Sequence, residues 1–171
     1  MHALIGYFFA LAMLRRGPQD LPASTVLLAL LAVANVLVGT ATGSQIFGGV
    51  RPAFGANVVD LALSMVTLFV LLQFKGHAAR WVQTATAFFG LGALAGVLML
   101  LFRSVADMVG ARELAMLSEL IIAVWVHVAL GHVLRHALDV PLLAGVVIVL
   151  AYSLMAFNII AQFFPPNIPG S

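Results

Sequence analysis

The chain has no cysteine and very few charged residues. Cysteine is absent from all 171 residues, which excludes disulfides, thiol chemistry and metal sites built on thiolates. Charged residues make up only 8% of the chain, whereas a soluble domain carries about 25%. A chain this poor in charge cannot cover its core with a polar surface, so the composition excludes an ordinary soluble domain.

Several sequence signatures of catalysis and of nucleic-acid binding are also missing. The chain contains no Gly-rich phosphate loop, no nucleophile elbow and no HExxH zinc motif. No run of basic residues interleaves with aromatic residues, as nucleic-acid binding would favour. We therefore predict a protein that is not an enzyme and that has no nucleic-acid partner.

Hydrophobic sequence, by contrast, is abundant and accounts for 63% of the residues. Five runs reach or approach the ~20 residues that a helix needs to cross a bilayer. They do not alternate polar with apolar residues, as the strands of a membrane barrel do. The sequence therefore predicts an all-α integral membrane bundle, with the lipid bilayer as partner, in residues 17–164. The five expected transmembrane helices are residues 21–41, 57–74, 81–102, 113–136 and 140–164.

The two ends of the chain differ from these runs. Residues 1–16 begin with about 14 apolar residues, which as a helix reach only roughly 21 Å. That length is short of a hydrocarbon core of ~30 Å, so we expect an interfacial or half-inserted helix. The tail, residues 165–171, contains three prolines and cannot be helical.

The distribution of Lys and Arg predicts how the bundle is oriented. Five spans place alternate loops on opposite sides, and cytoplasmic loops carry the excess of basic residues. We therefore expect the N-terminus in the cytoplasm and the C-terminus outside, which in a bacterial inner membrane is the periplasm. The side expected to be cytoplasmic carries Arg15, Arg16, Lys75, Arg80 and Arg135, and the other side carries Arg51, Arg103 and Arg112.

Two acids lie inside the expected spans. Asp60 is about one turn into the second span, Glu119 is about two turns into the fourth, and Arg103 follows the third on the same side. Ionisable groups inside a membrane are costly, so they usually pair or line a wet cavity. We expect an Asp60, Arg103 and Glu119 cluster, either as a structural ion pair or as part of a proton, ion or ligand path.

Three histidines gather at the end of the fourth span. His132 and His136 lie one helical turn apart on one face. Together with Arg135 and Asp139 they predict a polar cytoplasmic collar that could meet lipid headgroups or a partner. Neither a metal nor a cofactor is predicted there, because too few ligands gather. His127 points elsewhere and is expected to hydrogen-bond a neighbouring helix.

Small residues and short connections predict how the helices pack. Gly92 and Gly96 are four residues apart and therefore share a face, where small residues allow two helix backbones to approach closely. We expect that face to contact another helix of the chain. The connection around Ala137 is very short, so the fourth and fifth spans should pack as antiparallel neighbours.

The stretch "QDLPAS", residues 19–24, stands directly before the first span. In this layout the chain resembles the Yip1 family of five-span membrane proteins, in which an Asp-Leu motif precedes the first span. Asp20 and Leu21 match that motif, whereas the Tyr-Gly-Pro that follows in the family is not present. The stretches "GPQDLPAS" and "LGHVLRHALDVPLL" also look like small inner-membrane proteins of proteobacteria. The resemblance implies a role in membrane organisation through partners.

Three functions remain open from the sequence. The first is an accessory, scaffolding or assembly component that acts through a membrane-protein partner or a homo-oligomer. The second is a small transporter or channel-like protein that uses Asp60, Arg103 and Glu119. The third is a quinone- or cofactor-binding subunit of a redox complex that uses His127 and His132.

Overall fold

The computed structural model describes residues 2–167, and this part of the chain is helical throughout, apart from its connections. Five helices are long and apolar enough to cross a membrane, which confirms the predicted fold class. Two short 3-10 turns, η1 (Pro18–Asp20) and η2 (Ala78–Arg80), lie in the connections. The helices are α1 (His2–Ala12), α2 (Thr25–Gly43), α3 (Val50–Phe74), α4 (Trp81–Met108), α5 (Arg112–Leu138) and α6 (Leu142–Phe163).

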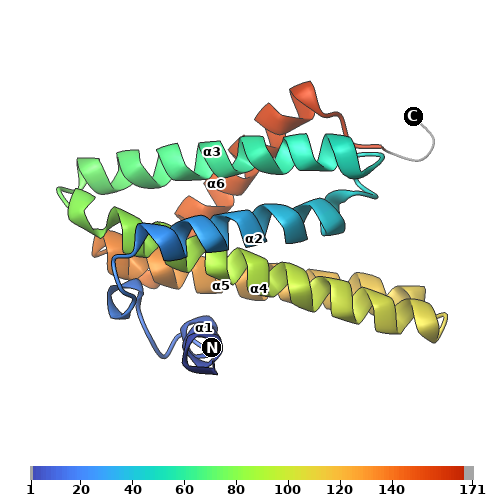
Figure 1. Ribbon diagram of the computed structural model, residues 1–171, viewed down its shortest axis with the longest axis horizontal. Helices are drawn as coiled ribbons and strands as arrows, with labels where there is room; N and C mark the ends of the chain where they lie inside the picture. The colour runs from blue at the N-terminus through green and yellow to red at the C-terminus, as the bar shows by residue number, and fades with distance from the viewer. Residues whose placement is uncertain (1, 168–171) are drawn as a thin grey trace.

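The five long helices pack in the spatial order α3, α2, α4, α5 and α6, and each contacts the next most extensively (Figure 1). Helix α6 then crosses α3 and makes a smaller contact with it. That crossing is built from small and branched residues, with Ala56 of α3 against Ala156 and Ile160 of α6. The long helices therefore surround a central space, with a thin wall where α3 and α6 meet.

Glycines lie at two close approaches between helices. A Cβ at Gly96 would lie 2.5 Å from Val38 Cγ1 of α2, so the expected packing of this face against another helix is confirmed. Helices α5 and α6 are antiparallel neighbours, also as expected, and they meet at Gly131 and Gly145. A Cβ at Gly131 would lie 2.8 Å from Val146 Cα, which only glycine avoids.

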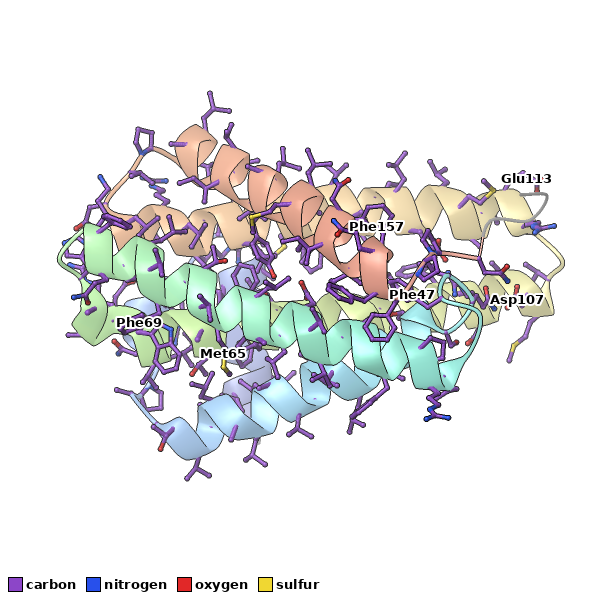
Figure 2. The ribbon with its side chains drawn as sticks, turned by 90° about the horizontal axis from the view of Figure 1, so that it is seen from above. Phe47, Met65, Phe69, Asp107, Glu113 and Phe157 are labelled. Atoms are coloured by element: carbon purple, nitrogen blue, oxygen red, sulfur yellow. The ribbon has the colours of Figure 1, made fainter. Side chains whose placement is uncertain are left out.

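Two helices are longer than the spans predicted within them. Helix α3 begins at Val50, although the sequence predicts a connection over residues 42–56. Helix α4 continues to Met108, past the predicted end of its span at residue 102. Pro52 is tolerated because it lies in the first turn, where the backbone N–H groups have no partner within a helix. Asp107 and Glu113 mark the far end of the α4–α5 hairpin, which reaches beyond the neighbouring ends of α3 and α6 (Figure 2).

Helix α1 lies across the bundle, because Figure 1 shows it end-on while the long helices run in the plane of the picture. Its 11 residues reach about 16 Å, too short to cross a bilayer. The Tyr7 hydroxyl donates to the carbonyl of Gly17 at 2.7 Å. Burial, together with the nearby Asp20 carboxylate, raises the pKa of Tyr7 to about 12. Tyr7 therefore stays neutral and fastens α1 to the following loop, while its place at a membrane interface stays a prediction.

Contacts between loops define one end of the bundle, which we call the basic end. Arg80 Nη1 lies 3.1 Å from Asp139 Oδ2, so the α3–α4 and α5–α6 connections meet. His77 Nδ1 donates to the Ala137 carbonyl at 3.1 Å. The opposite end, where residues 109–111 join α4 to α5, is the hairpin end. These names describe the structure alone, and which end faces the cytoplasm stays a prediction.

Candidate intramembrane site

Arg103 and Glu119 form an ion pair between α4 and α5. Arg103 Nε donates to Glu119 Oε1 at 2.8 Å, and Arg103 Nη2 donates to the same oxygen. The two side chains are 24% and 32% exposed, so the pair lies partly buried near the hairpin end. The predicted salt bridge between these two residues is confirmed, whereas its functional role remains a proposal.

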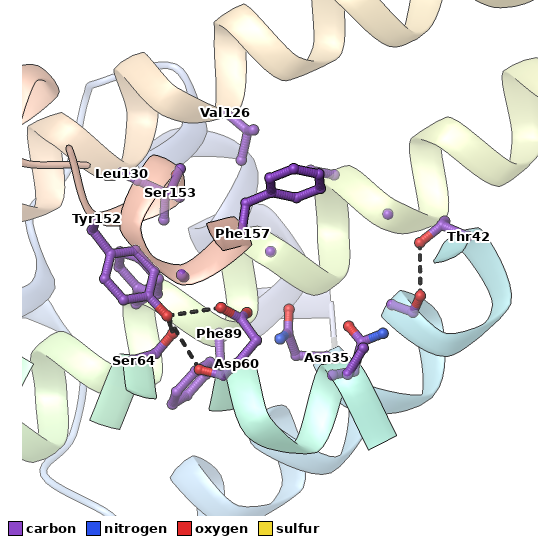
Figure 3. Close-up of a pocket in the computed structure, with 18 of the residues that line it drawn as sticks. Asn35, Thr42, Asp60, Ser64, Phe89, Val126, Leu130, Tyr152, Ser153 and Phe157 are labelled. Atoms are coloured by element: carbon purple, nitrogen blue, oxygen red, sulfur yellow. Dashed lines mark hydrogen bonds between the residues drawn. The ribbon is translucent and has the colours of Figure 1, made fainter. Parts of the chain in front are cut away.

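Asp60 lies apart from this pair and contacts hydroxyl groups instead. The Tyr152 hydroxyl of α6 donates to Asp60 Oδ1 at 2.7 Å, and it lies 2.6 Å from the Ser64 hydroxyl (Figure 3). Because Tyr152 has a single proton and gives it to Asp60, Ser64 donates to Tyr152. The three side chains form a hydrogen-bonded chain that joins α3 to α6.

The expected cluster of three ionisable residues is therefore wrong for Asp60. Because α3 begins at Val50, Asp60 lies ten residues, or about 15 Å, into its helix and not one turn. Arg103 is only five residues from the end of α4. The two side chains sit at different depths of the bundle and line different cavities.

A central cavity of about 390 Å³ lies between all five long helices. Aromatic and aliphatic side chains form most of its wall, among them Phe88, Phe89 and Phe157. Polar side chains also come from four of the five helices and meet at mid-length. They are Asn35, Asn57, Asp60, Ser64, His127, Tyr152 and Ser153.

Two of the cavity's carboxamides fit into notches made by glycine. The Asn57 side chain of α3 occupies the position that a Cβ at Gly39 of α2 would take. In the same way, the Asn35 side chain lies where a Cβ at Gly92 of α4 would be. Gly92 thus contacts another helix, as predicted, but it makes room for a polar group and not for closer backbone packing.

His127 makes the interhelical hydrogen bond that the sequence predicts. Its Nδ1 lies 2.7 Å from the Ala123 carbonyl, which can only accept, so this nitrogen carries the proton. Its Nε2 lies 3.1 Å from the Ser153 hydroxyl of α6 and accepts from it. Both ring nitrogens are therefore engaged within the protein.

Two further cavities adjoin the central cavity in turn on the side of the hairpin end. A second cavity of about 460 Å³ shares Thr42 and Met99 with it and is lined by Arg103 and Glu119. A third cavity, of about 440 Å³, shares Arg103 and Glu119 with the second and is also lined by Asp107 near the tip of the hairpin. The three cavities lie one after another along the α4–α5 hairpin, and the ion pair lines the two that are nearer its tip.

The space on the other side of the cavity is narrow. The adjoining void between α3, α5 and α6 measures only about 10 Å³ and is lined by Thr67, Leu71 and Leu134 among others. A cavity must exceed about 10–15 Å³ to hold one water. The void that adjoins the central cavity on the side of the basic end is therefore too small to hold a water.

The histidine collar is only partly as predicted. His132 is buried, with only 5% of its surface exposed. Its Nε2 donates to the Arg16 carbonyl at 3.0 Å, so His132 does not belong to an exposed collar. The reason is that the loop after α1 covers this part of α5. Within the described residues its Nδ1 has no hydrogen-bond partner. Arg135 and Asp139 are exposed, and the His136 ring lies 4.5 Å from that of His132.

The described residues contain no cluster of metal ligands, and comparison finds no similar protein. Within residues 2–167, no group of three or more His, Cys, Asp or Glu side chains is placed to hold a metal ion. Comparison with protein families, curated proteins and solved structures finds no match. The Yip1 resemblance therefore remains a prediction, and the candidate site depends on its own chemistry.

Several residues of the cavity were not predicted from the sequence. Asn57, Asp60 and Ser64 follow one another at spacings of three and four, which places them on one face of a helix. All three residues lie within the predicted span 57–74, so this signal was available for Asn57 and Ser64. Tyr152 and Ser153 offered no comparable pattern, because only the crossing of α3 and α6 brings them to Asp60.

Proposed function

We propose that this protein binds a small solute in its central cavity and exchanges it through the hairpin end, as a transporter or channel-like protein would. The observation that carries the proposal is the polar cavity at mid-bundle, adjoined by a wide cavity on one side and by only a narrow void on the other. Polar and ionisable groups inside membrane helices usually line substrate or ion pathways. A cavity of about 390 Å³ also falls within the usual size of small-molecule sites.

The orientation predicted from Lys and Arg makes this path open to the periplasm of a bacterial inner membrane. The closed side then faces the cytoplasm, which corresponds to an outward-facing state of alternating access. Single-cysteine variants test the orientation directly, because the chain has no cysteine of its own. Ala79→Cys should react with an impermeant thiol reagent from the cytoplasm and Val109→Cys from outside. The reverse pattern would contradict the orientation.

Cysteine accessibility also tests the path. Thr42→Cys and Met99→Cys, at the junction of two cavities, should react with a small charged thiosulfonate in protein reconstituted into lipid. Thr67→Cys, beside the narrow void, should remain unreactive. Leu30→Cys serves as control, because Leu30 is 63% exposed on the outer surface of α2 and should face lipid, where a charged reagent does not enter.

The expected order of reactivity separates this function from a purely structural one. If Thr42→Cys and Met99→Cys react no faster than Leu30→Cys, no aqueous path reaches the cavity and the proposal fails. If Thr67→Cys reacts as fast as Thr42→Cys, the cavity is open at both ends. That result would indicate a pore and not a binding site with one entrance.

The two other functions remain predictions from the sequence. An accessory or assembly role would be tested by native co-purification followed by mass spectrometry. A redox role would require His127 or His132 as a ligand. His127 has both ring nitrogens bonded within the protein, and His132 Nε2 is bonded to the backbone. Purified protein with a visible absorbance spectrum would favour this role.

A further inference from the structure

The Asp60 carboxylate has an unused hydrogen-bond acceptor beside the central cavity. Asp60 Oδ1 accepts a hydrogen bond from Tyr152. Within the described residues, Asp60 Oδ2 has no hydrogen-bond partner, and it is not among the side-chain atoms that are both fully buried and without a partner. The Oδ1 atoms of Asn35 and Asn57 instead lie in the notches at Gly92 and Gly39, against neighbouring helices. The hydroxyls of Tyr152 and Ser153 already donate within the protein. A ligand that donates an N–H or O–H group to Asp60 therefore complements this cavity.

The charged groups around the cavity also favour a cationic ligand. Within residues 2–167, no Lys or Arg side chain lines it. Arg103 lies beside the next cavity and is paired with Glu119. The Tyr152 hydroxyl donates to the Asp60 carboxylate, which suits an ionised carboxylate. Asp60 thus lacks a fixed counter-ion, and a cationic ligand can provide one.

The aromatic side chains of the cavity wall favour an organic cation over an inorganic one. Phe88, Phe89 and Phe157 line the cavity, and aromatic faces attract organic cations. Small inorganic cations such as Ca²⁺ or Mg²⁺ require a close shell of about six or more oxygens. A cavity of about 390 Å³ with a mostly apolar wall does not supply such a shell. An ammonium group on an apolar body matches both the carboxylate and the rings.

We propose that the central cavity binds a small organic monocation, a primary or secondary ammonium carried on an apolar body, with Asp60 as its counter-ion. The phenylalanine rings contact the apolar body of the ligand. This inference depends on the proposed function, because the ligand must reach the cavity from the hairpin end.

A matched series of ligands tests the inference. Protein in lipid nanodiscs is titrated calorimetrically with 2-phenylethylamine, 2-phenylethanol and phenylacetate, which share a phenyl body but are cationic, neutral and anionic. Empty nanodiscs correct for partition into lipid. We expect the amine to bind at least roughly tenfold more tightly than the alcohol, because a charge-assisted hydrogen bond is about twice as strong as a neutral one. Phenylacetate should not bind.

Two variants test whether Asp60 causes the preference for the amine over the alcohol. Asp60→Asn keeps an acceptor for Tyr152 and should reduce the affinity for the amine to about that for the alcohol. Glu113→Gln removes an exposed carboxylate at the tip of the hairpin, outside the cavity, and should leave the preference unchanged. The comparison of amine and alcohol in the unaltered protein needs no variant, so it remains decisive even if Asp60→Asn does not fold.

The possible outcomes separate the inference from the proposed function. Equal binding of amine and alcohol would overturn the inference but leave a solute-binding cavity. Thermal stabilisation by sodium chloride, but not by the amine or by N-methylglucamine chloride, would overturn it in favour of an inorganic ion. If no member of the series binds, the inference fails. The reactivity of Thr42→Cys then decides the proposed function independently.

Discussion

Glu119 and Asp60 are both carboxylates inside long apolar helices, but they have different neighbours. Glu119 contacts a guanidinium that donates to it from two nitrogens, near the hairpin end. Asp60 lies deeper, and its hydrogen-bond donor is the neutral hydroxyl of Tyr152. One acid has its counter-ion built into the chain, whereas the other has space and polar neutral groups around it.

Because of this difference, the two acids can contribute to different properties, namely stability and ligand binding. An ion pair that is complete within the protein fixes two helices and offers little to a ligand. A carboxylate without a cation, beside a cavity, can gain a counter-ion only by binding one or by taking up a proton. We therefore expect substitutions around Glu119 to change stability first, and substitutions at Asp60 to change ligand binding first.

Removal of Arg103 should have the largest effect on stability. Arg103→Met leaves the Glu119 carboxylate partly buried without its partner. We expect the free energy of unfolding to fall by about 2 kcal/mol, less than for a fully buried pair because both side chains are partly exposed. Unfolding in detergent micelles by a denaturing detergent measures the change.

A double variant is the control for this prediction. Arg103→Met combined with Glu119→Met removes both charges, and it should be more stable than Arg103→Met alone, because coupled residues are not additive. If the two substitutions destabilise additively, Arg103 and Glu119 act separately. The contrast between a paired and an unpaired acid would then be wrong.

Loss of the Tyr152 hydroxyl should have an intermediate effect. Tyr152→Phe removes the polar link between α3 and α6 and leaves Asp60 Oδ1 and the Ser64 hydroxyl without this partner. We expect a loss of about 1 kcal/mol, the usual net value of one hydrogen bond. Tyr7→Phe, at the other tyrosine of the chain, gives a matched comparison outside the cavity. Unchanged stability in Tyr152→Phe would show that the α3–α6 crossing does not depend on the hydroxyl.

The sequence was sufficient to predict the parts of this structure that depend on local pattern. The five apolar runs, the helix contact of Gly96 and the Arg103–Glu119 pair follow from run length, residue spacing and the cost of an unpaired charge in a membrane. The last of these was predictable because a short loop joins the two helices. Pairing between neighbours in sequence requires little knowledge of the whole fold.

The central cavity could not be predicted in the same way, because it depends on contacts between helices distant in sequence. Tyr152 meets Asp60 only where α6 crosses α3. The predicted start of the second span was also seven residues late, since Pro52 and the glycines nearby indicated a loop. That start placed Asp60 only one turn into its helix and suggested Arg103 as its partner. Burial of His132 depends similarly on the loop after α1.

The smallest change in stability should accompany Asp60→Asn, and this variant tests the comparison most sharply. Asparagine keeps the size of the side chain and an oxygen that can accept from Tyr152, so we expect a change within about 0.5 kcal/mol. Glu119→Gln also keeps an acceptor, but it leaves Arg103 without a countercharge and should cost about 1 kcal/mol. Ligand binding should show the opposite order, with amine affinity reduced in Asp60→Asn and nearly retained in Glu119→Gln. If Asp60→Asn is the less stable variant while amine binding is unchanged, Asp60 is a structural residue and the roles assigned to the two acids must be exchanged.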